Sequence, residues 1–179
     1  MMGPLDVIDF WRGAGEAKWF AKDAGFDGAV SLRFRDALKD ARAGAFDDWA
    51  HGPQGALALV IMLDQFSRHI HRGNPLAFAG DAKALSLARA AIASGFHQAI
   101  AGSLARWFVM PFEHAEDLEP QMRGVALFTT MGFTDLAWWA QVHLDIIARF
   151  GRFPHRNAIL GRRSTPAELA FLAAGGFAG

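Results

Sequence analysis

The pattern of apolar and polar residues is most informative between residues 56 and 72, which read ALALVIMLDQFSRHIHR. At 100° per residue, the apolar side chains of the first half fall on every side of a helix, which is typical of a buried helix. The second half admits charged residues without a turn signal, and Asp64 and Arg68 share a face whose earlier turns are apolar. Because Pro53 suits a helix start and Gly73 a helix end, the sequence predicts a buried central helix over 53–72 with a charged end.

Apolar residues recur at helical spacing along the rest of the chain. They predict further helices over about 4–12, 27–43, 75–94, 103–110, 113–131, 135–150 and 166–174. Asp27 and Asn74 are predicted N-caps, and Pro75 suits the first helical position. Thr165 and Glu168 have the spacing of a capping box. No segment alternates apolar and polar residues as a strand would, so we expect an all-α fold of about eight or nine helices.

Composition narrows the class of protein. The 179 residues are 52% hydrophobic and include 16 Phe and 6 Trp, which excludes disorder and suits one domain over 1–179. Lys plus Arg and Asp plus Glu balance at 18 each, so we expect neither nucleic acid nor an anionic membrane as a partner. The absence of Cys removes thiol chemistry and Cys-ligated metals. Since no apolar run spans a membrane and the N-terminus MMGPLDVIDFW lacks the basic start of a signal peptide, we expect a soluble, cytoplasmic protein.

Of the charged residues, Asp81 has the predicted position at which burial of a charge would destabilise the protein most. It falls in the middle of the apolar face of the helix expected over 75–94. A carboxylate there costs several kcal/mol unless it is paired. Arg68 and Arg72 end the preceding predicted helix, and they are the nearest plausible counter-charges.

Four ordered segments carry a resemblance to a known family: LDQFSRHIHRG (63–73), FAGDAKAL (78–85), MPFEHAED (110–117) and GRFPHRNAILGRRSTPAEL (151–169). Together they resemble the bacterial domain-of-unknown-function family 924, and the resemblance covers nearly the whole chain. It implies a tetratricopeptide-like α–α superhelix and implies no activity.

The sequence departs from the pattern of that family at four positions. Ser67, His69, His71 and Ala115 stand where Pro, Asn, an aromatic residue and Ser are usual. We therefore do not include His69 or His71 among the predicted site residues.

The charged and polar residues that fit the pattern lie mostly at helix ends or in connectors, where sites commonly form. If they converge, they form an Arg/His pocket edged by carboxylates, and guanidinium groups bind carboxylate or phosphate through two hydrogen bonds. The alternative is a polar network between helices that fixes their packing without any ligand. The predicted lining of this pocket for a small anionic ligand is Asp64, Arg68, Arg72, Asp81, Glu113, His114, Glu116, Arg152, His155, Arg156 and Asn157.

Metal binding and hydrolysis are weaker hypotheses. Glu113 and Glu116, with His114 and His155, supply metal-binding residue types, but the HExxH motif and the paired ExxH motifs of di-iron bundles are absent. We expect no metal and no cofactor. His114 beside Glu116 or Asp117 has the chemistry of a general base, but no GxSxG motif supplies a nucleophile. We assign no catalytic residue and expect a binding protein rather than an enzyme.

The main alternative function is a protein-interaction scaffold. Superhelical folds offer a concave groove for a partner peptide. Trp19, Phe20, Trp49 and Trp138 are candidates to line such a groove, although core packing is the ordinary role of such residues. His143 lies alone on an apolar helix face and is predicted to be a hydrogen-bonded core histidine.

Overall fold

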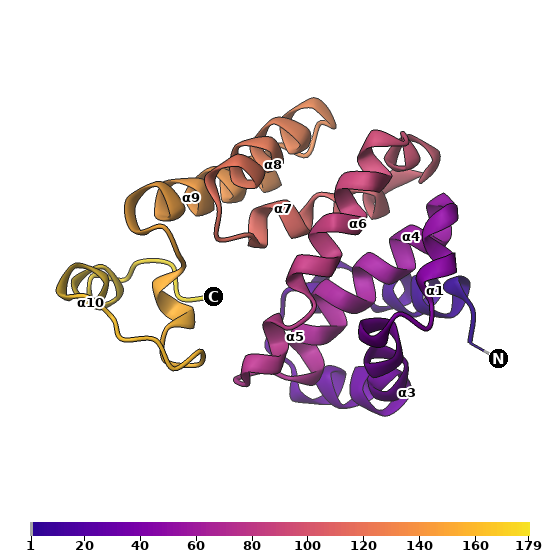
Figure 1. Ribbon diagram of the computed structural model, residues 1–179, viewed down its shortest axis with the longest axis horizontal. Coiled ribbons are helices and arrows are strands. Elements are labelled where there is room, and N and C mark those ends of the chain that lie inside the picture. The colour runs from indigo at the N-terminus through magenta and orange to yellow at the C-terminus, as the bar shows by residue number, and fades with distance from the viewer. Residues whose placement is uncertain (1) are drawn as a thin grey trace. The chain divides into compact units, whose positions relative to one another are not determined.

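A computed structural model describes residues 2–179, and none of these residues forms a β-strand (Figure 1). The predicted all-α fold is confirmed, whereas the tetratricopeptide-like form of a superhelix remains a prediction. The helices are α1 Pro4–Ala14, α2 Glu16–Trp19, α3 Ala24–Ala43, α4 Pro53–Val60, α5 Ser67–Ile70, α6 Asp81–Ala93, α7 Met110–His114, α8 Leu118–Thr130, α9 Thr134–Phe150 and α10 Pro166–Ala173. Short 3-10 helices are η1 Asp47–His51, η3 Pro75–Phe78, η4 Phe96–Ala99, η5 Gly102–Phe108 and η6 Pro154–Arg156, and the π-helix η2 is Ile61–Phe66.

The chain forms two compact units. Unit 1 contains the residues up to Arg72 and the range Leu76–Pro111. Unit 2 contains Gly73–Pro75 and Phe112–Gly179. Each unit has buried apolar residues of its own, and the single domain over 1–179 remains a prediction.

The central helix of unit 1 is continuous but not uniform. The elements α4, η2 and α5 follow one another from Pro53 to Ile70 without a break, which confirms a helix beginning at Pro53. Its middle, Ile61–Phe66, is a wider π-helical turn in which every residue is buried. Such turns are rare and frequently lie at functional sites. A π-turn rotates the residues that follow it, so a uniform 100° per residue does not place the charged end of this helix correctly.

An aromatic core surrounds that helix in unit 1. Trp11, Phe66 and Trp107 are fully buried, and the ring centroids of Trp11 and Trp107 are 5.0 Å apart. Trp19 is only 4% exposed, and its Nε1 donates a hydrogen bond to the backbone oxygen of Trp11 at 2.7 Å. Trp19 is therefore a core residue and does not line an open groove.

The helix predicted over 75–94 is wrong, because it is divided into η3 and α6. Gly80 lies between them, and a Cβ atom at this residue would lie 2.3 Å from the backbone oxygen of Leu63. Only glycine permits this approach of the chain to the π-turn, and the helix begins again at Asp81. Asp81 thus lies in the first turn of α6, where the helix dipole favours a carboxylate, and not in the middle of an apolar face.

The start of α3 also differs from the prediction. Asp23, not Asp27, is the N-cap, and its carboxylate accepts hydrogen bonds from the backbone N–H groups of Gly25 at 2.8 Å and Phe26 at 3.1 Å. Asp27 lies in the first turn instead, because Asp23 offers the same capping chemistry four residues earlier. The capping box of Thr165 and Glu168 at the start of α10 is confirmed.

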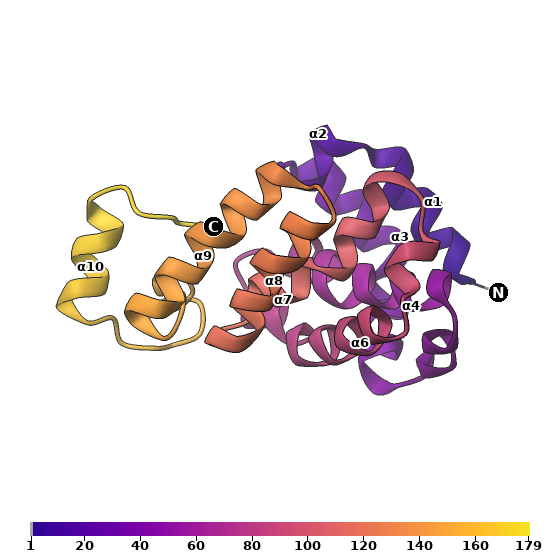
Figure 2. The same ribbon diagram turned by 90° about the horizontal axis from the view of Figure 1, so that it is seen from above.

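In unit 2, α8 and α9 pack side by side, and Figure 2 shows the pair from a second direction. The end of α9 and the connector after it bury Ile146, Ile147 and Phe153, with four partly buried residues packed against them: Val142, Phe150, Phe171 and Phe177. Across residues 2–179, every helix is too short or too polar to span a membrane.

Candidate functional site

Arg68 is the centre of an ion network in unit 1. Its Nη1 donates to Asp81 Oδ1 at 2.9 Å and its Nη2 donates to Asp81 Oδ2 at 3.0 Å. The guanidinium carbon also lies 5.7 Å from the ring centroid of Phe78. Of the two predicted counter-charges of Asp81, Arg68 and Arg72, the structure selects Arg68, in the planar two-bond geometry that arginine favours.

Asp64 adds a second carboxylate to this network from within the π-turn. Its side chain is 1% exposed, and its Oδ1 accepts a hydrogen bond from Arg68 Nη1 at 3.0 Å. Its Oδ2 accepts from Gln65 Nε2 at 2.5 Å. All four carboxylate oxygens of Asp64 and Asp81 therefore accept a hydrogen bond. The positive charge of Arg68 is balanced by these two carboxylates of unit 1.

Arg72 binds a residue that the sequence did not single out. Its Nε donates to Asp27 Oδ2 at 2.6 Å, and its Nη2 donates to Asp27 Oδ1 at 2.9 Å. His69 Nδ1 lies 2.7 Å from the same Oδ1. Burial raises the pKa of Asp27, but hydrogen bonds from Arg72 and His69 outweigh burial and lower that pKa below its ordinary value. The signal available in the sequence is that His69 and Arg72 are three residues apart and face one way.

His69 has a carboxylate partner, as a general base often does, but its ring is not accessible to a substrate. The residue is 5% exposed, and its ring lies 5.6 Å from Trp11 and 5.1 Å from Phe26, centroid to centroid. Burial lowers the pKa of His69 despite the opposing effect of Asp27, so the imidazole is neutral near pH 7. This closed arrangement fits packing and not catalysis.

Two ion pairs organise the connector of unit 2. Arg162 binds both oxygens of Glu116 at 2.6 and 2.9 Å, and the backbone N–H of Phe153 donates to Glu116 Oε1 at 2.8 Å. Arg152 binds both oxygens of Glu168 at 2.7 and 2.9 Å. The predicted residues Glu116 and Arg152 are thus paired with Arg162 and Glu168, which the sequence did not assign to the site.

These pairs shift the pKa values of both carboxylates. Burial raises the pKa of Glu116, but hydrogen bonds from Arg162 and the Phe153 N–H bring it below its usual range. The hydrogen bond from Arg152 is the main reason that the pKa of Glu168 is lowered to about 2. Both groups are ionised at neutral pH.

A different group of polar residues surrounds the ring of Phe153. The ring centroid of His143 is 5.2 Å from that of Phe153, the centroid of His155 is 5.5 Å away, and the guanidinium carbon of Arg156 is 4.5 Å away. His143 Nδ1 lies 2.9 Å from Glu113 Oε1. We call Glu113, His143, His155, Arg156 and Asn157 the histidine cluster.

Several buried polar atoms of the histidine cluster have no hydrogen-bond partner within residues 2–179. They are Oε2 of Glu113, Nδ1 and Nε2 of His143, Nδ1 of His155 and Oδ1 of Asn157. His143 Nδ1 nevertheless lies at ion-pair distance, 2.9 Å, from Glu113 Oε1. Glu113 is 3% exposed, His143 6% and Asn157 0%. A buried polar group without a partner costs about 1–3 kcal/mol, so a group of them calls for an explanation.

His155 carries no charge at neutral pH. Burial, and then the charge of Arg156, lower the pKa of His155 from its ordinary value to about 3. A neutral imidazole has one donor and one acceptor nitrogen, so His155 is able to donate to an anion without being a cation.

The carboxylates near His114 have other partners. His114 is half-buried at the end of α7, Glu116 is bound by Arg162, and Asp117 caps α8 by accepting from the N–H of Glu119 at 3.2 Å. Within the described range 2–179, no three His, Asp or Glu side chains are grouped so as to hold a metal ion.

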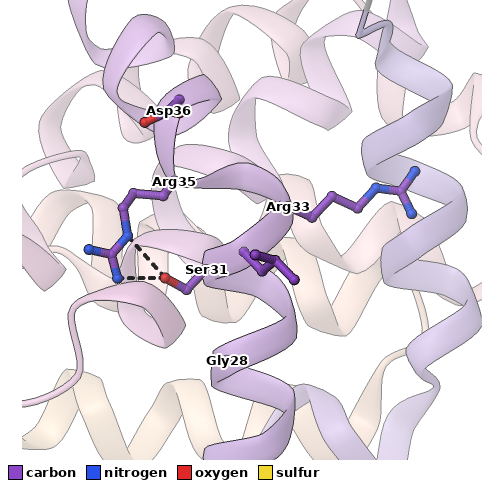
Figure 3. Close-up of a pocket in the computed structure, with 6 residues that line it drawn as sticks. Gly28, Ser31, Arg33, Arg35 and Asp36 are labelled. Atoms are coloured by element: carbon purple, nitrogen blue, oxygen red, sulfur yellow. Dashed lines mark hydrogen bonds between the residues drawn. The ribbon is translucent and has the colours of Figure 1, made fainter.

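A shallow depression of about 480 Å³ lies on the outer face of α3 (Figure 3). It is lined by residues of this one helix, and none of them is a predicted site residue: Gly28, Ser31, Leu32, Arg33, Arg35 and Asp36. Arg35 turns back to Ser31, with donor distances of 2.6 and 3.0 Å, whereas Arg33 points away from both. A one-helix surface does not enclose a ligand, so we do not assign it a function.

The eleven predicted site residues thus fall into two sets. Asp64, Arg68, Arg72 and Asp81 belong to unit 1, and the other seven belong to unit 2. Within unit 1 the structure brings Asp64, Arg68 and Asp81 together and places Arg72 with Asp27. Convergence of all eleven on one pocket remains a prediction.

Comparisons with known proteins agree with the resemblance seen in the sequence. The family model described as "Bacterial protein of unknown function (DUF924)" matches residues 7–176. The solved structure of a protein of unknown function from Agrobacterium tumefaciens is 44% identical, with a TM-score of 0.92 over 96% of this chain and 97% of that chain. No curated protein matches. The chain therefore belongs to the DUF924 family of bacterial proteins.

Proposed function

We propose that unit 2 binds a small anionic ligand at the histidine cluster. The observation that carries this proposal is the group of buried polar atoms around Phe153 that have no partner within the described chain. Protein interiors rarely contain such atoms, and a bound molecule that supplies their hydrogen bonds is one established reason for them.

The chemistry of the cluster favours an anion. The guanidinium carbon of Arg156 lies 4.5 Å from the ring centroid of Phe153, and the N–H donors of a guanidinium lie at the rim of its plane. Its charge acts on His155 and Glu116 alike. A carboxylate or phosphate at that rim receives hydrogen bonds from Arg156 and from the neutral imidazole of His155.

Glu113 defines a second requirement of the ligand. Its carboxylate is buried and 2.9 Å from His143, so its negative charge faces a histidine rather than the guanidinium. Glu113 Oε2 is an acceptor without a partner in the described chain, which a hydroxyl or amino group of the ligand would satisfy. The proposed ligand is therefore a small acid that also carries a donor group.

The experiment is a thermal-shift screen of the full chain with inorganic phosphate, acetate, citrate and serine. A ligand at 100 times its Kd stabilises the protein by about 2.7 kcal/mol. We expect Arg156→Gln to abolish the shift. Arg149→Gln is the matched control, because Arg149 is an exposed arginine of the same unit that stacks on Phe150 at 4.7 Å.

Two results would contradict the proposal. One is a melting temperature that none of these anions changes. The other is an equal loss of the anion-dependent shift in Arg156→Gln and Arg149→Gln. Such a result would show that the shift depends on the net charge of the protein and not on Arg156.

Docking of a partner peptide is a second candidate function, favoured by one observation. Trp138 is 60% exposed and Trp139 44% exposed on α9. Tryptophan is enriched at binding surfaces, although single exposed aromatics are common. Calorimetric titration of an amphipathic helical peptide tests this candidate, and a Trp138→Ser/Trp139→Ser variant that binds as well as the wild type would reject it.

A further inference from the structure

The last residues of the chain turn back sharply after α10. Gly175 has φ +80°, a left-handed conformation that glycine adopts without strain. At Gly176, a Cβ atom would lie 2.5 Å from the ring of Phe171. Position 175 thus depends on glycine, whereas a side chain at Gly176 would require the ring of Phe171 to shift.

This reversal brings residues 177–179 onto the histidine cluster. The ring centroid of Phe177 lies 4.5 Å from that of His143 and 5.2 Å from that of His155. A Cβ atom on Gly179 would lie 3.1 Å from Cδ2 of His155. The segment therefore lies against His143, whose two ring nitrogens have no hydrogen-bond partner within residues 2–179, and against His155, whose Nδ1 has none there.

We infer that residues 175–179 form a strap that closes over the anion site and opens to admit the ligand. This inference rests on the proposed function. Phe177 anchors the strap with one partly buried ring, whereas Ala178 and Gly179 are exposed. The ring of Phe177 supplies apolar contact but accepts no conventional hydrogen bond from an imidazole, so this ring covers His143 and His155 without satisfying their nitrogens.

A closing strap lowers the apparent affinity for the ligand. When a binding-competent state is only partly populated, the measured Kd rises by the inverse of that fraction. A strap that is open in about one molecule in ten weakens binding about tenfold. Removal of the anchor restores the intrinsic affinity.

The test compares the full chain with Phe177→Ala and Gly175→Pro. The first variant removes the anchor, and the second keeps Phe177 but imposes a negative φ that prevents the reversal. Leu169→Ala is the control, because Leu169 is a 56% exposed residue of α10. For each protein, the rate at which diethylpyrocarbonate modifies His155 is measured by mass spectrometry, and the Kd for inorganic phosphate is measured by calorimetry.

We expect both strap variants to label His155 about tenfold faster and to bind phosphate about tenfold more tightly, while Leu169→Ala behaves as the wild type. Unchanged labelling in both variants overturns the strap, and equal phosphate binding by all four proteins then leaves the proposed function standing. Faster labelling without phosphate binding by any protein overturns the proposed function and supports the strap as a cover of the imidazoles. The two ideas therefore fail separately.

Discussion

The Arg68 network of unit 1 and the histidine cluster of unit 2 are both buried groups of charged and polar residues, but they differ in how far their atoms are satisfied. In unit 1, each oxygen of Asp64 and Asp81 accepts a hydrogen bond from Arg68 or Gln65. In unit 2, Glu113, His143, His155 and Asn157 all retain buried atoms without a partner in the described chain. A complete network of this kind fixes packing, and the incomplete one is the basis of the ligand site that we propose for unit 2.

The two groups also differ in where the chain places them. The Arg68 network joins the π-turn of the central helix to the first turn of α6, so it is built on helices. Glu113 and His143 of the histidine cluster lie on α7 and α9, but its other three residues follow Phe153 in the connector between α9 and α10, where residues 154–156 form the short helix η6. Connectors on a rigid framework are where binding residues concentrate.

The largest expected effect comes from breaking the complete network. Arg68→Ala leaves the buried carboxylate of Asp64 without its counter-charge, which costs about 3–5 kcal/mol of unfolding free energy. Urea denaturation measures this loss. The control is Arg12→Ala, which removes an ion pair with Asp9 whose side chains are both 61% exposed and should cost less than about 1 kcal/mol. Similar losses in the two variants would show that Arg68 is not a network centre.

The second prediction concerns the approach of Gly80 to the π-turn. Gly80→Ala places a Cβ atom against the backbone oxygen of Leu63, and overpacking of this kind costs about 1–3 kcal/mol. Gly28→Ala lies in α3 with nothing within 4 Å of the added Cβ, so it should stabilise the protein by about 0.5–1 kcal/mol. Thermal or urea unfolding should therefore give opposite signs, and a stabilising Gly80→Ala would contradict the close approach.

The third prediction uses pH to separate the residues of unit 2. The pKa of His155 is lowered from 6.5 to about 3. Between these pH values, His155 is therefore protonated in the unfolded chain and neutral in the folded chain. Titration of His155 therefore costs the protein nothing above pH 6.5 and lowers its unfolding free energy as pH falls through that window, by up to about 1.4 kcal/mol per pH unit. Unfolding free energies of His155→Phe should fall less steeply there than those of the wild type.

Glu168 supplies the internal control for that experiment. Its pKa is lowered from 4.5 to about 2, so its contribution is complete above pH 4.5 and is lost as pH falls to about 2. Glu168→Gln should flatten only this more acidic window. Identical pH profiles for wild type and His155→Phe would show that His155 is not held neutral by the fold.

The smallest expected effect is a gain in stability at neutral pH. His155→Phe removes a buried nitrogen that has no partner in the described chain and keeps an aromatic ring beside Phe153, so we expect a stabilisation of about 1 kcal/mol. The same variant should lose its response to anions in the thermal-shift screen. A loss of stability would instead show that His155 serves packing. The histidine cluster would then not differ in this respect from the Arg68 network.

Particular residues show how far the sequence could predict the site. The sequence offered Arg68 and Arg72 as counter-charges for Asp81, but only the structure selects Arg68, which is the more distant of the two along the chain. The pairings of Asp27 with Arg72 and of Glu113 with His143 join residues 45 and 30 positions apart, and local spacing contains no information about them. His143 was expected to be a hydrogen-bonded core residue; it is buried, but it contacts Glu113 without forming a hydrogen bond.

By itself, the sequence determined the all-α class, the capping box of α10 and the buried central helix, because these depend on interactions between residues three or four apart. Only the tertiary structure decided the π-turn, the division of 75–94 at Gly80 and the identity of the unsatisfied polar atoms. These features depend on how closely one backbone approaches another and on which donors lie within reach of each acceptor. Both are properties of packing in three dimensions, so no periodicity along the chain reveals them.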